Sequence, residues 1–134
     1  MSKATGSNGC DVAIVGGGLA GGLIALALAD RCPQLHVRVI EEGAQAGGNH
    51  RWSWFASDLD EAGTRLLAPL PKAEWHAGYE VAFPRHRRVL DTAYRSLASD
   101  NFAHHLAAAL PAGTLLTGQR AEGIAADGVM LASG

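Results

Sequence analysis

Two hydrophobic patterns follow one another in the first third of the chain. A short apolar run, residues 11–15, is rich in β-branched side chains and bounded by glycine, which predicts a buried strand. Residues 18–31 are apolar at helical spacing and are followed by Pro33, which predicts a helix. Because this segment is apolar nearly all round, we expect a buried helix. Residues 36–41 predict a second strand, so the whole segment predicts a βαβ unit with parallel strands.

The patterns in the middle of the chain are shorter. Residues 58–70 predict a short helix, with Asp58 or Asp60 as its N-terminal cap. Residues 79–84 and 87–97 predict extended segments, and the second is long enough to bend.

A clear amphipathic helix is predicted to begin where Ser99 or Asp100 can cap it. Its apolar positions recur at spacings of four, at Phe102, Leu106 and Leu110.

The last segment predicts antiparallel strands. Short apolar runs alternate with turn residues, and Asp127 and Gly128 indicate a β-hairpin. The chain stops just after a predicted strand with no closing helix. We therefore expect an incomplete domain at the front of a longer protein, with residues 1–10 as a disordered start and residues 11–134 as the N-terminal part of the domain.

Composition places the chain among globular proteins, with 134 residues, 48% of them hydrophobic and 18% charged. The net charge is -2 and the sequence has no long run of like charges, so we expect no nucleic-acid partner. Cys10 and Cys32 are too few for a disulfide framework, which indicates a reducing compartment. The histidines lack ligand spacing, so no metal site is expected. Residues 12–29 are uncharged for the length of a membrane span, but their five glycines favour a folded segment.

The candidate chemistry lies in the turn between the first strand and the first helix. Gly16, Gly18 and Gly21 form a GxGxxG motif in that context. The first glycine permits the tight turn, the second lets a pyrophosphate approach the backbone, and the third lets the helix pack close to the sheet. Free N–H groups and the positive end of the helix dipole hold the phosphates. The predicted cofactor contacts are Gly16, Gly17, Gly18, Leu19, Ala20 and Gly21; the alternative is a glycine turn without a ligand.

An acidic residue at the end of the second strand, Glu41, lies 20 positions after Gly21. A carboxylate there accepts hydrogen bonds from ribose hydroxyls and repels a 2′-phosphate, which favours FAD or NAD over NADP. Glu42 is the neighbouring candidate. Because successive strand residues point to opposite faces, only one of the two faces the ligand, and we expect the other to be solvated.

Five residues separate Glu41 from the doublet Gly47 and Gly48, which opens the stretch GGNHRWSW. Such a doublet lets a loop lie against a cofactor without Cβ clashes. The spacing resembles FAD proteins of the glutathione-reductase type, which implies FAD as the cofactor. The expected fold class is α/β, a Rossmann-like FAD/NAD(P)-binding domain of that type, with a parallel sheet and a β-meander. For Trp52 and Trp54 we expect packing against an apolar layer.

Four longer stretches of the sequence resemble one particular protein family. VGGGLAGGLIALAL, GGNHRWSW, GYEVAFP and YRSLASDNFAHHL, in this order, resemble the bacterial lycopene beta-cyclase family over residues 11–134. The resemblance implies an enzyme that cyclises the ends of lycopene to give γ- and β-carotene with no net redox change. It implies reduced FAD as the active cofactor, NAD(P)H as reductant, and cofactor contacts at Gly48, Asn49 and His50. A loop histidine held by the backbone is the alternative for His50. The catalytic residues stay unknown, because the family's acidic residues lie in later segments.

The resemblance also implies partners. Lycopene is a membrane hydrocarbon, so we expect the full-length enzyme to be cytoplasmic and peripheral to the membrane, and residues 71–98 to reach toward the substrate region. This segment alone is expected to be inactive. The alternatives are a redox flavoenzyme, such as an FAD-dependent monooxygenase, and a non-catalytic nucleotide-binding fragment. The basic run at residues 85–88 is interpreted as a solvated strand edge, with contact to anionic lipid as the alternative.

Overall fold

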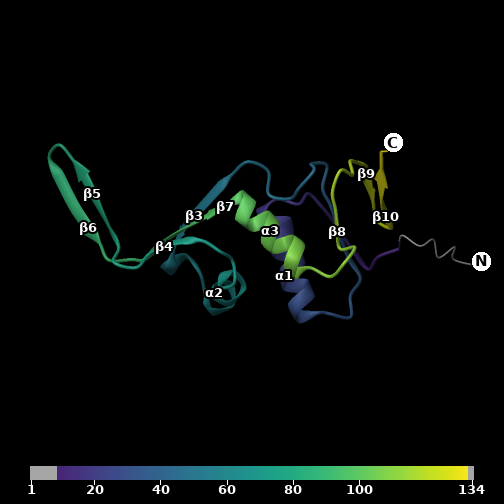
Figure 1. Ribbon diagram of the computed structural model, residues 1–134, viewed down its shortest axis with the longest axis horizontal. Coiled ribbons are helices and arrows are strands. Elements are labelled where there is room, and N and C mark those ends of the chain that lie inside the picture. Colours follow the sequence, from purple (N-terminus) through teal and green to yellow (C-terminus); the bar gives the residue numbers. More distant parts are fainter. Residues whose placement is uncertain (1–8, 133–134) are drawn as a thin grey trace, which may run out of the picture.

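The computed structural model describes residues 9–132. The molecule is elongated, with helices α1 (Leu19–Arg31) and α3 (Ser99–Ala109) side by side near its centre and a β-hairpin projecting at one end (Figure 1). Most of the predicted disordered start, residues 1–10, lies outside the described residues. Within residues 9–132, no helix has both the length and the apolar character required to cross a bilayer.

The predicted βαβ unit is confirmed. Strands β1 (Val12–Val15) and β2 (Val37–Ile40) pair in parallel, with α1 as the crossover between them. A short strand, β8 (Leu115–Leu116), joins the other side of β2, which gives a three-stranded parallel sheet in the order β1-β2-β8. The carboxyl ends of β1 and β2 therefore meet at one edge of the sheet.

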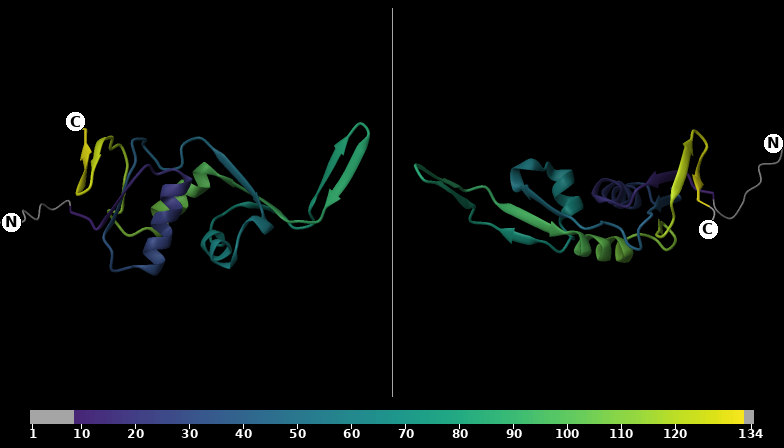
Figure 2. Two further views of the ribbon diagram at one scale, coloured as in Figure 1. Left: turned by 180° about the vertical axis from the view of Figure 1, so that it is seen from behind. Right: turned by 90° about the horizontal axis from the view of Figure 1, so that it is seen from above.

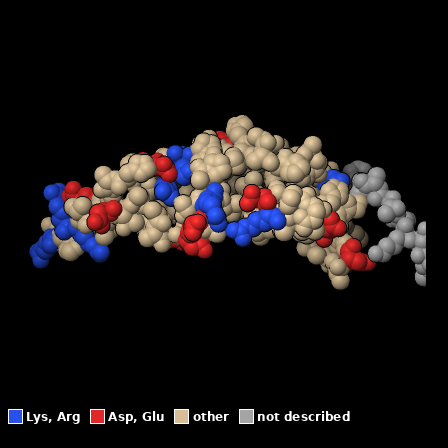
Figure 3. Space-filling view, turned by 90° about the horizontal axis from the view of Figure 1, so that it is seen from below, with Lys and Arg blue, Asp and Glu red and all other residues tan. Residues whose placement is uncertain are grey.

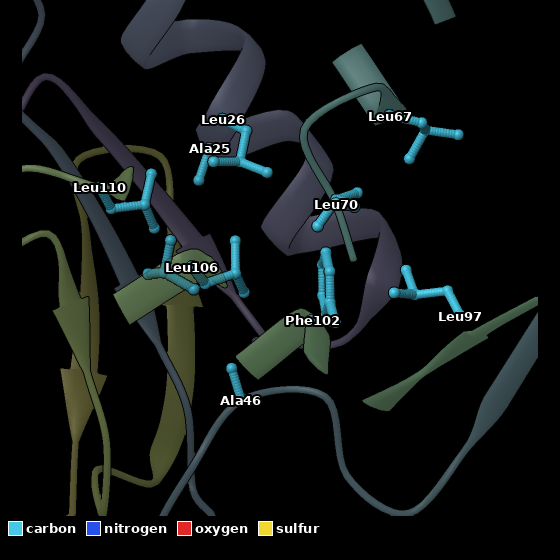
Figure 4. Close-up of a cluster of buried hydrophobic side chains, with 10 residues drawn as sticks. Ala25, Leu26, Ala46, Leu67, Leu70, Leu97, Phe102, Leu106 and Leu110 are labelled. Atoms are coloured by element: carbon cyan, nitrogen blue, oxygen red, sulfur yellow. The ribbon is translucent and has the colours of Figure 1, made fainter. Parts of the chain in front are cut away.

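The apolar core lies where α1, α3 and the segment around α2 (Glu61–Leu67) meet (Figure 4). Phe102 and Leu106, predicted on one face of α3, are fully buried there. The expectation that α1 is buried nearly all round is wrong, because Ile24 is 50% exposed. Other described residues cover α1 where it faces the sheet, α3 and the segment around α2.

A second sheet is antiparallel and has the order β3-β7-β4. Its strands are β3 (Arg51–Phe55), β7 (Tyr94–Ala98) and β4 (Ala73–Trp75). Strands β3 and β4 are not among the predicted elements. A short 3₁₀ helix (Ala56–Asp58) and α2 connect β3 to β4, and Asp60 caps α2 by accepting a hydrogen bond from the N–H of Gly63 at 2.8 Å.

Two hairpins occupy opposite ends of the molecule (Figure 2). Strands β5 (Tyr79–Phe83) and β6 (His86–Leu90) form the projecting one, so the predicted extended segment 87–97 does bend, into β6 and β7. Strands β9 (Ala121–Ala125) and β10 (Gly128–Leu131) form the other, which confirms the hairpin expected near residue 127. Its two-residue turn lies one position earlier than predicted, because Gly128 already pairs with Ala125.

Candidate functional site

The glycine turn between β1 and α1 is formed by close backbone contacts. Gly16 has a φ of +100°, which favours glycine, and its N–H donates to the carbonyl of Ile40 at 2.8 Å. A Cβ at Gly21 would lie 2.0 Å from the carbonyl oxygen of Gly16. The last glycine of the motif thus lets the first turn of α1 sit directly against the end of β1.

The middle of the turn faces open space. Among residues 9–132, no atom beyond Gly18 and its two chain neighbours lies within 4 Å of the position that a Cβ would take at Gly18. The first backbone hydrogen bond of α1 runs from the N–H of Gly22 to the carbonyl of Gly18 at 2.9 Å. The N–H groups of Leu19 and Ala20 therefore have no partner within the helix and lie at its positive end. This exposed cradle suits an anionic group such as a diphosphate.

Glu41 binds the glycine turn through its side chain. One carboxylate oxygen accepts a hydrogen bond from the N–H of Gly17 and the other from the N–H of Gly43, both at 2.7 Å. A carboxylate has about four acceptor sites, so capacity for ribose hydroxyls is left. Glu42 is 71% exposed, and its ion pair with Arg120 measures 3.9 Å. Of the two acidic residues, only Glu41 thus lies against the turn.

The glycine doublet is held on two sides. The N–H of Gly47 donates to the carbonyl of Gly17 at 2.8 Å, which joins the loop to the turn. Gly47 and Gly48 have φ values of +88° and +61°. A Cβ on Gly47 would lie 2.9 Å from the carbonyl oxygen of Ser99. Gly47 is therefore required for close packing against α3, and the backbone conformation of Gly48 also favours glycine.

Ser99 does not cap α3, so that prediction is wrong, as is its alternative, Asp100. The N-cap position belongs to Ala98, which makes no side-chain cap, and the helix begins at Ser99. The Ser99 hydroxyl instead accepts a hydrogen bond from the N–H of His50 at 3.2 Å, and the Ser99 N–H donates to the carbonyl of His50 at 3.0 Å. Ser99 thus anchors the end of the glycine loop, a role that sequence reasoning missed.

The side chains of GGNHRWSW divide between solvent and core. Gly48, Asn49 and His50 are exposed beside the turn. Trp52 packs edge-on against Phe102 with ring centroids 5.3 Å apart, and Trp54 also packs against the core cluster. The packing role expected for the two tryptophans is therefore confirmed.

Three predicted pieces of sequence meet at one place: the glycine turn, Glu41 and the loop at residues 47–50. Gly17 joins them, because its N–H binds Glu41 and its carbonyl binds Gly47. No sequence signal beyond the motif itself marked Gly17 as this junction.

A hollow of about 1110 Å³ lies elsewhere, on the side of the sheet that faces β9 and β10, and does not include the glycine turn. The turn is the candidate site, because its backbone donors and open space suit a diphosphate group.

Comparison with known proteins identifies close relatives. The family model described as Lycopene cyclase protein matches residues 11–133. The chain is 50% identical over 100 residues to the lycopene beta-cyclase of Pseudescherichia vulneris, covering 75% of this chain and 26% of that protein. It is 44% identical over 96 residues to the lycopene beta-cyclase of Pantoea ananas, covering 72% and 25%. The chain thus spans about a quarter of the length of these relatives.

Solved structures share the fold at low sequence identity. THI4 of Thermovibrio ammonificans superposes with a TM-score of 0.51 at 20% identity, covering 91% of this chain and 45% of that one. A protein described as an FAD containing monooxygenase, from Photorhabdus luminescens subsp. laumondii, gives a TM-score of 0.52 at 20% identity, covering 90% and 34%. The predicted α/β fold class, a Rossmann-like domain with a parallel sheet, is confirmed. The match of the family model to nearly all of the chain shows that the chain belongs to the lycopene cyclase family.

Proposed function

We propose that the complete protein containing this chain is a lycopene beta-cyclase that closes the ends of lycopene into the rings of γ- and β-carotene. The proposal rests on one observation, the 50% identity to a lycopene beta-cyclase over 100 residues. The reaction is an isomerisation: a terminal double bond is protonated, the resulting carbocation cyclises, and a proton is lost. The substrate is neither oxidised nor reduced overall, and NAD(P)H serves only to keep the cofactor reduced.

The chain's contribution to this reaction is cofactor binding. When bound, reduced FAD supplies negative charge that stabilises the cationic transition state in an apolar site. The N–H groups at the start of α1 would hold the diphosphate, with Gly18 leaving room for it. Glu41 would accept hydrogen bonds from the adenosine ribose, and residues 48–50 would lie against the flavin. The open cradle at Gly18 and the hydrogen bonds of Glu41 support this assignment.

We further propose that the complete protein works as a peripheral membrane protein at the cytoplasmic face, since its substrate dissolves in the hydrocarbon core of the bilayer. The stretch predicted to reach toward the substrate, residues 71–98, includes the hairpin that projects from the body in Figure 1. The catalytic acid and base are not assigned to residues of this chain.

The pigment profile of a lycopene-accumulating bacterium tests the proposed reaction. Expression of the complete reading frame is expected to convert lycopene into γ- or β-carotene, identified by chromatography and absorption spectrum. Gly18→Val is expected to abolish the conversion, because a branched side chain would fill the space that the diphosphate requires. Since nothing contacts that position, the variant should accumulate to the same level as the unmodified protein.

Two outcomes would contradict the proposal. Full conversion by Gly18→Val would show that the glycine turn does not hold the cofactor. Unchanged lycopene together with a folded, FAD-loaded unmodified protein would identify a redox flavoenzyme instead, which oxygen and NADPH consumption would then reveal.

Glu41→Gln is expected to weaken both the turn and the cofactor site. The amide keeps one acceptor oxygen, so the N–H of Gly17 or of Gly43 loses its partner, at a cost of about 1–3 kcal/mol in the free energy of unfolding. The affinity for FAD should fall as well, since a ribose acceptor is lost. Urea unfolding and FAD titration of the complete protein measure the two effects. The matched control is Glu42→Gln, which should change neither, since Glu42 is solvated.

A further inference from the structure

The hairpin β5–β6 exposes apolar side chains away from the body of the molecule. Its two strands pair only with each other among the described residues, and all three ribbon views place it clear of the helices. Phe83 is 66% exposed and Val89 is 70% exposed. Directly opposite residues of an antiparallel pair share a face, and every second pair faces the same way. Phe83 therefore shares its face with Val81 and Arg88, which pair two rungs nearer the base. Val89 lies on the opposite face, together with Arg87. The hairpin therefore presents apolar and basic groups together.

The same hairpin concentrates positive charge. Arg85, Arg87 and Arg88 are three of the 11 basic residues of the chain, whereas Glu80 is one of its 13 acidic residues. Glu80 pairs with Arg87. Arg85 and Arg88 form no ion pair within residues 9–132. The rest of the chain is net acidic, and Figure 3 shows basic side chains gathered at the hairpin end of the molecule.

An aromatic group at the base of the hairpin links it to the body. The ring of Tyr79 stacks on that of Phe55 at 5.5 Å and lies 6.2 Å from that of Tyr94. Trp75 packs on Tyr94 from the other side at 5.7 Å. Because these residues belong to β3, β4, β5 and β7, the contacts hold the base of the hairpin against the second sheet.

We propose that this hairpin, residues 79–90, docks the protein onto an anionic lipid surface. Arg85 and Arg88 would bind lipid headgroups, and Phe83 would insert at the boundary between headgroups and acyl chains. The proposal rests on the proposed function, because an enzyme with a hydrocarbon substrate must reach that substrate in a membrane. Arg85 and Arg88 have no acidic partner within residues 9–132, and they share the hairpin with the exposed ring of Phe83. Lipid docking needs only a few basic and aromatic side chains, which favours lipid over an acidic protein.

Vesicle binding by the complete protein tests the proposal. The protein is expected to co-sediment with vesicles that contain phosphatidylglycerol in phosphatidylcholine, and far less with phosphatidylcholine alone. Arg85→Gln/Arg88→Gln should lower the partition coefficient about 25-fold, since each basic residue near the surface contributes about fivefold. Phe83→Ala should reduce the binding that persists at high salt, because apolar insertion is not screened.

The matched control removes the same charge from the body of the molecule. Arg65→Gln/Arg120→Gln changes two exposed arginines outside the hairpin and should leave the partition coefficient unchanged. An equal loss in both double variants would show that net charge alone drives binding and would overturn the proposal. Unchanged binding with a lowered melting temperature in the hairpin variant would also overturn it and would place the hairpin inside the complete protein. Vesicle binding needs no turnover, so hairpin-dependent binding without lycopene conversion would refute the proposed function and leave this proposal standing.

Discussion

Gly21→Ala is expected to destabilise the protein by about 3 kcal/mol or more and to remove FAD binding. The new Cβ would lie 2.0 Å from the Gly16 carbonyl oxygen and 3.1 Å from the Cγ2 of Ile14. The closer contact is with the backbone directly after β1, which cannot move aside as a flexible side chain would. The first turn of α1 must shift away from the sheet, at the upper end of the cost of overpacking. The displaced turn then misplaces the N–H groups that we assign to the diphosphate.

Gly18→Ala is the matched control for this prediction. It adds the same methyl group three positions earlier in the same motif, where nothing lies within 4 Å. The melting temperature of the complete protein should therefore fall with Gly21→Ala and stay nearly constant with Gly18→Ala. FAD titration should show no binding with Gly21→Ala and weaker binding with Gly18→Ala. Equal melting temperatures for the two variants would contradict the close packing of α1 on β1.

The part of the fold that follows from local pattern was predictable. The strand at residues 11–15, the glycine motif and the helix after it are neighbours in sequence, and the acidic residue falls at the end of the next strand. Each of these signals depends on residues within one turn or one strand. The candidate site could be predicted to the same extent, because a βαβ unit brings the motif and Glu41 to one edge of the sheet.

The contacts that complete the site connect distant parts of the chain. His50 and Ser99 are 49 positions apart, and nothing in either local sequence announces their hydrogen bonds. Ser99 has the residue type of a helix cap, so the local rule predicts a cap, but the long-range bond to the loop determines its role. Strand β3 did carry a signal: in Arg51–Phe55, Trp52 and Trp54 alternate with Ser53. This period of two predicts a strand, but it was obscured by the glycines just before it.

The contact between α1 and α3 yields the last prediction, a reversal of sign at Gly22. A Cβ there would lie 2.4 Å from the Cζ of Phe102, whose side chain is fully buried and wedged against Trp52. Gly22→Ala should therefore destabilise the protein by about 1–3 kcal/mol through overpacking. Phe102→Ala should cost about 3–5 kcal/mol, because it leaves a cavity. With the ring gone, the Cδ1 of Leu106, which would lie 2.8 Å from the new Cβ, can move into the vacated space. Gly22→Ala should then stabilise by about 1 kcal/mol, since alanine favours a helix interior over glycine.

Urea unfolding midpoints of the complete protein and its three variants form a double-mutant cycle for this contact. The added methyl group should lower the midpoint when Phe102 is present and raise it when Phe102 is absent. If Phe102→Ala does not fold, Phe102→Leu provides the same comparison with a smaller cavity. Additive effects of the two substitutions would mean that α1 and α3 do not touch at this point. A reversal of sign would show that Gly22, which follows the GxGxxG motif, must be glycine because α1 packs closely on α3. The cofactor would then account for Gly18 but not for Gly22.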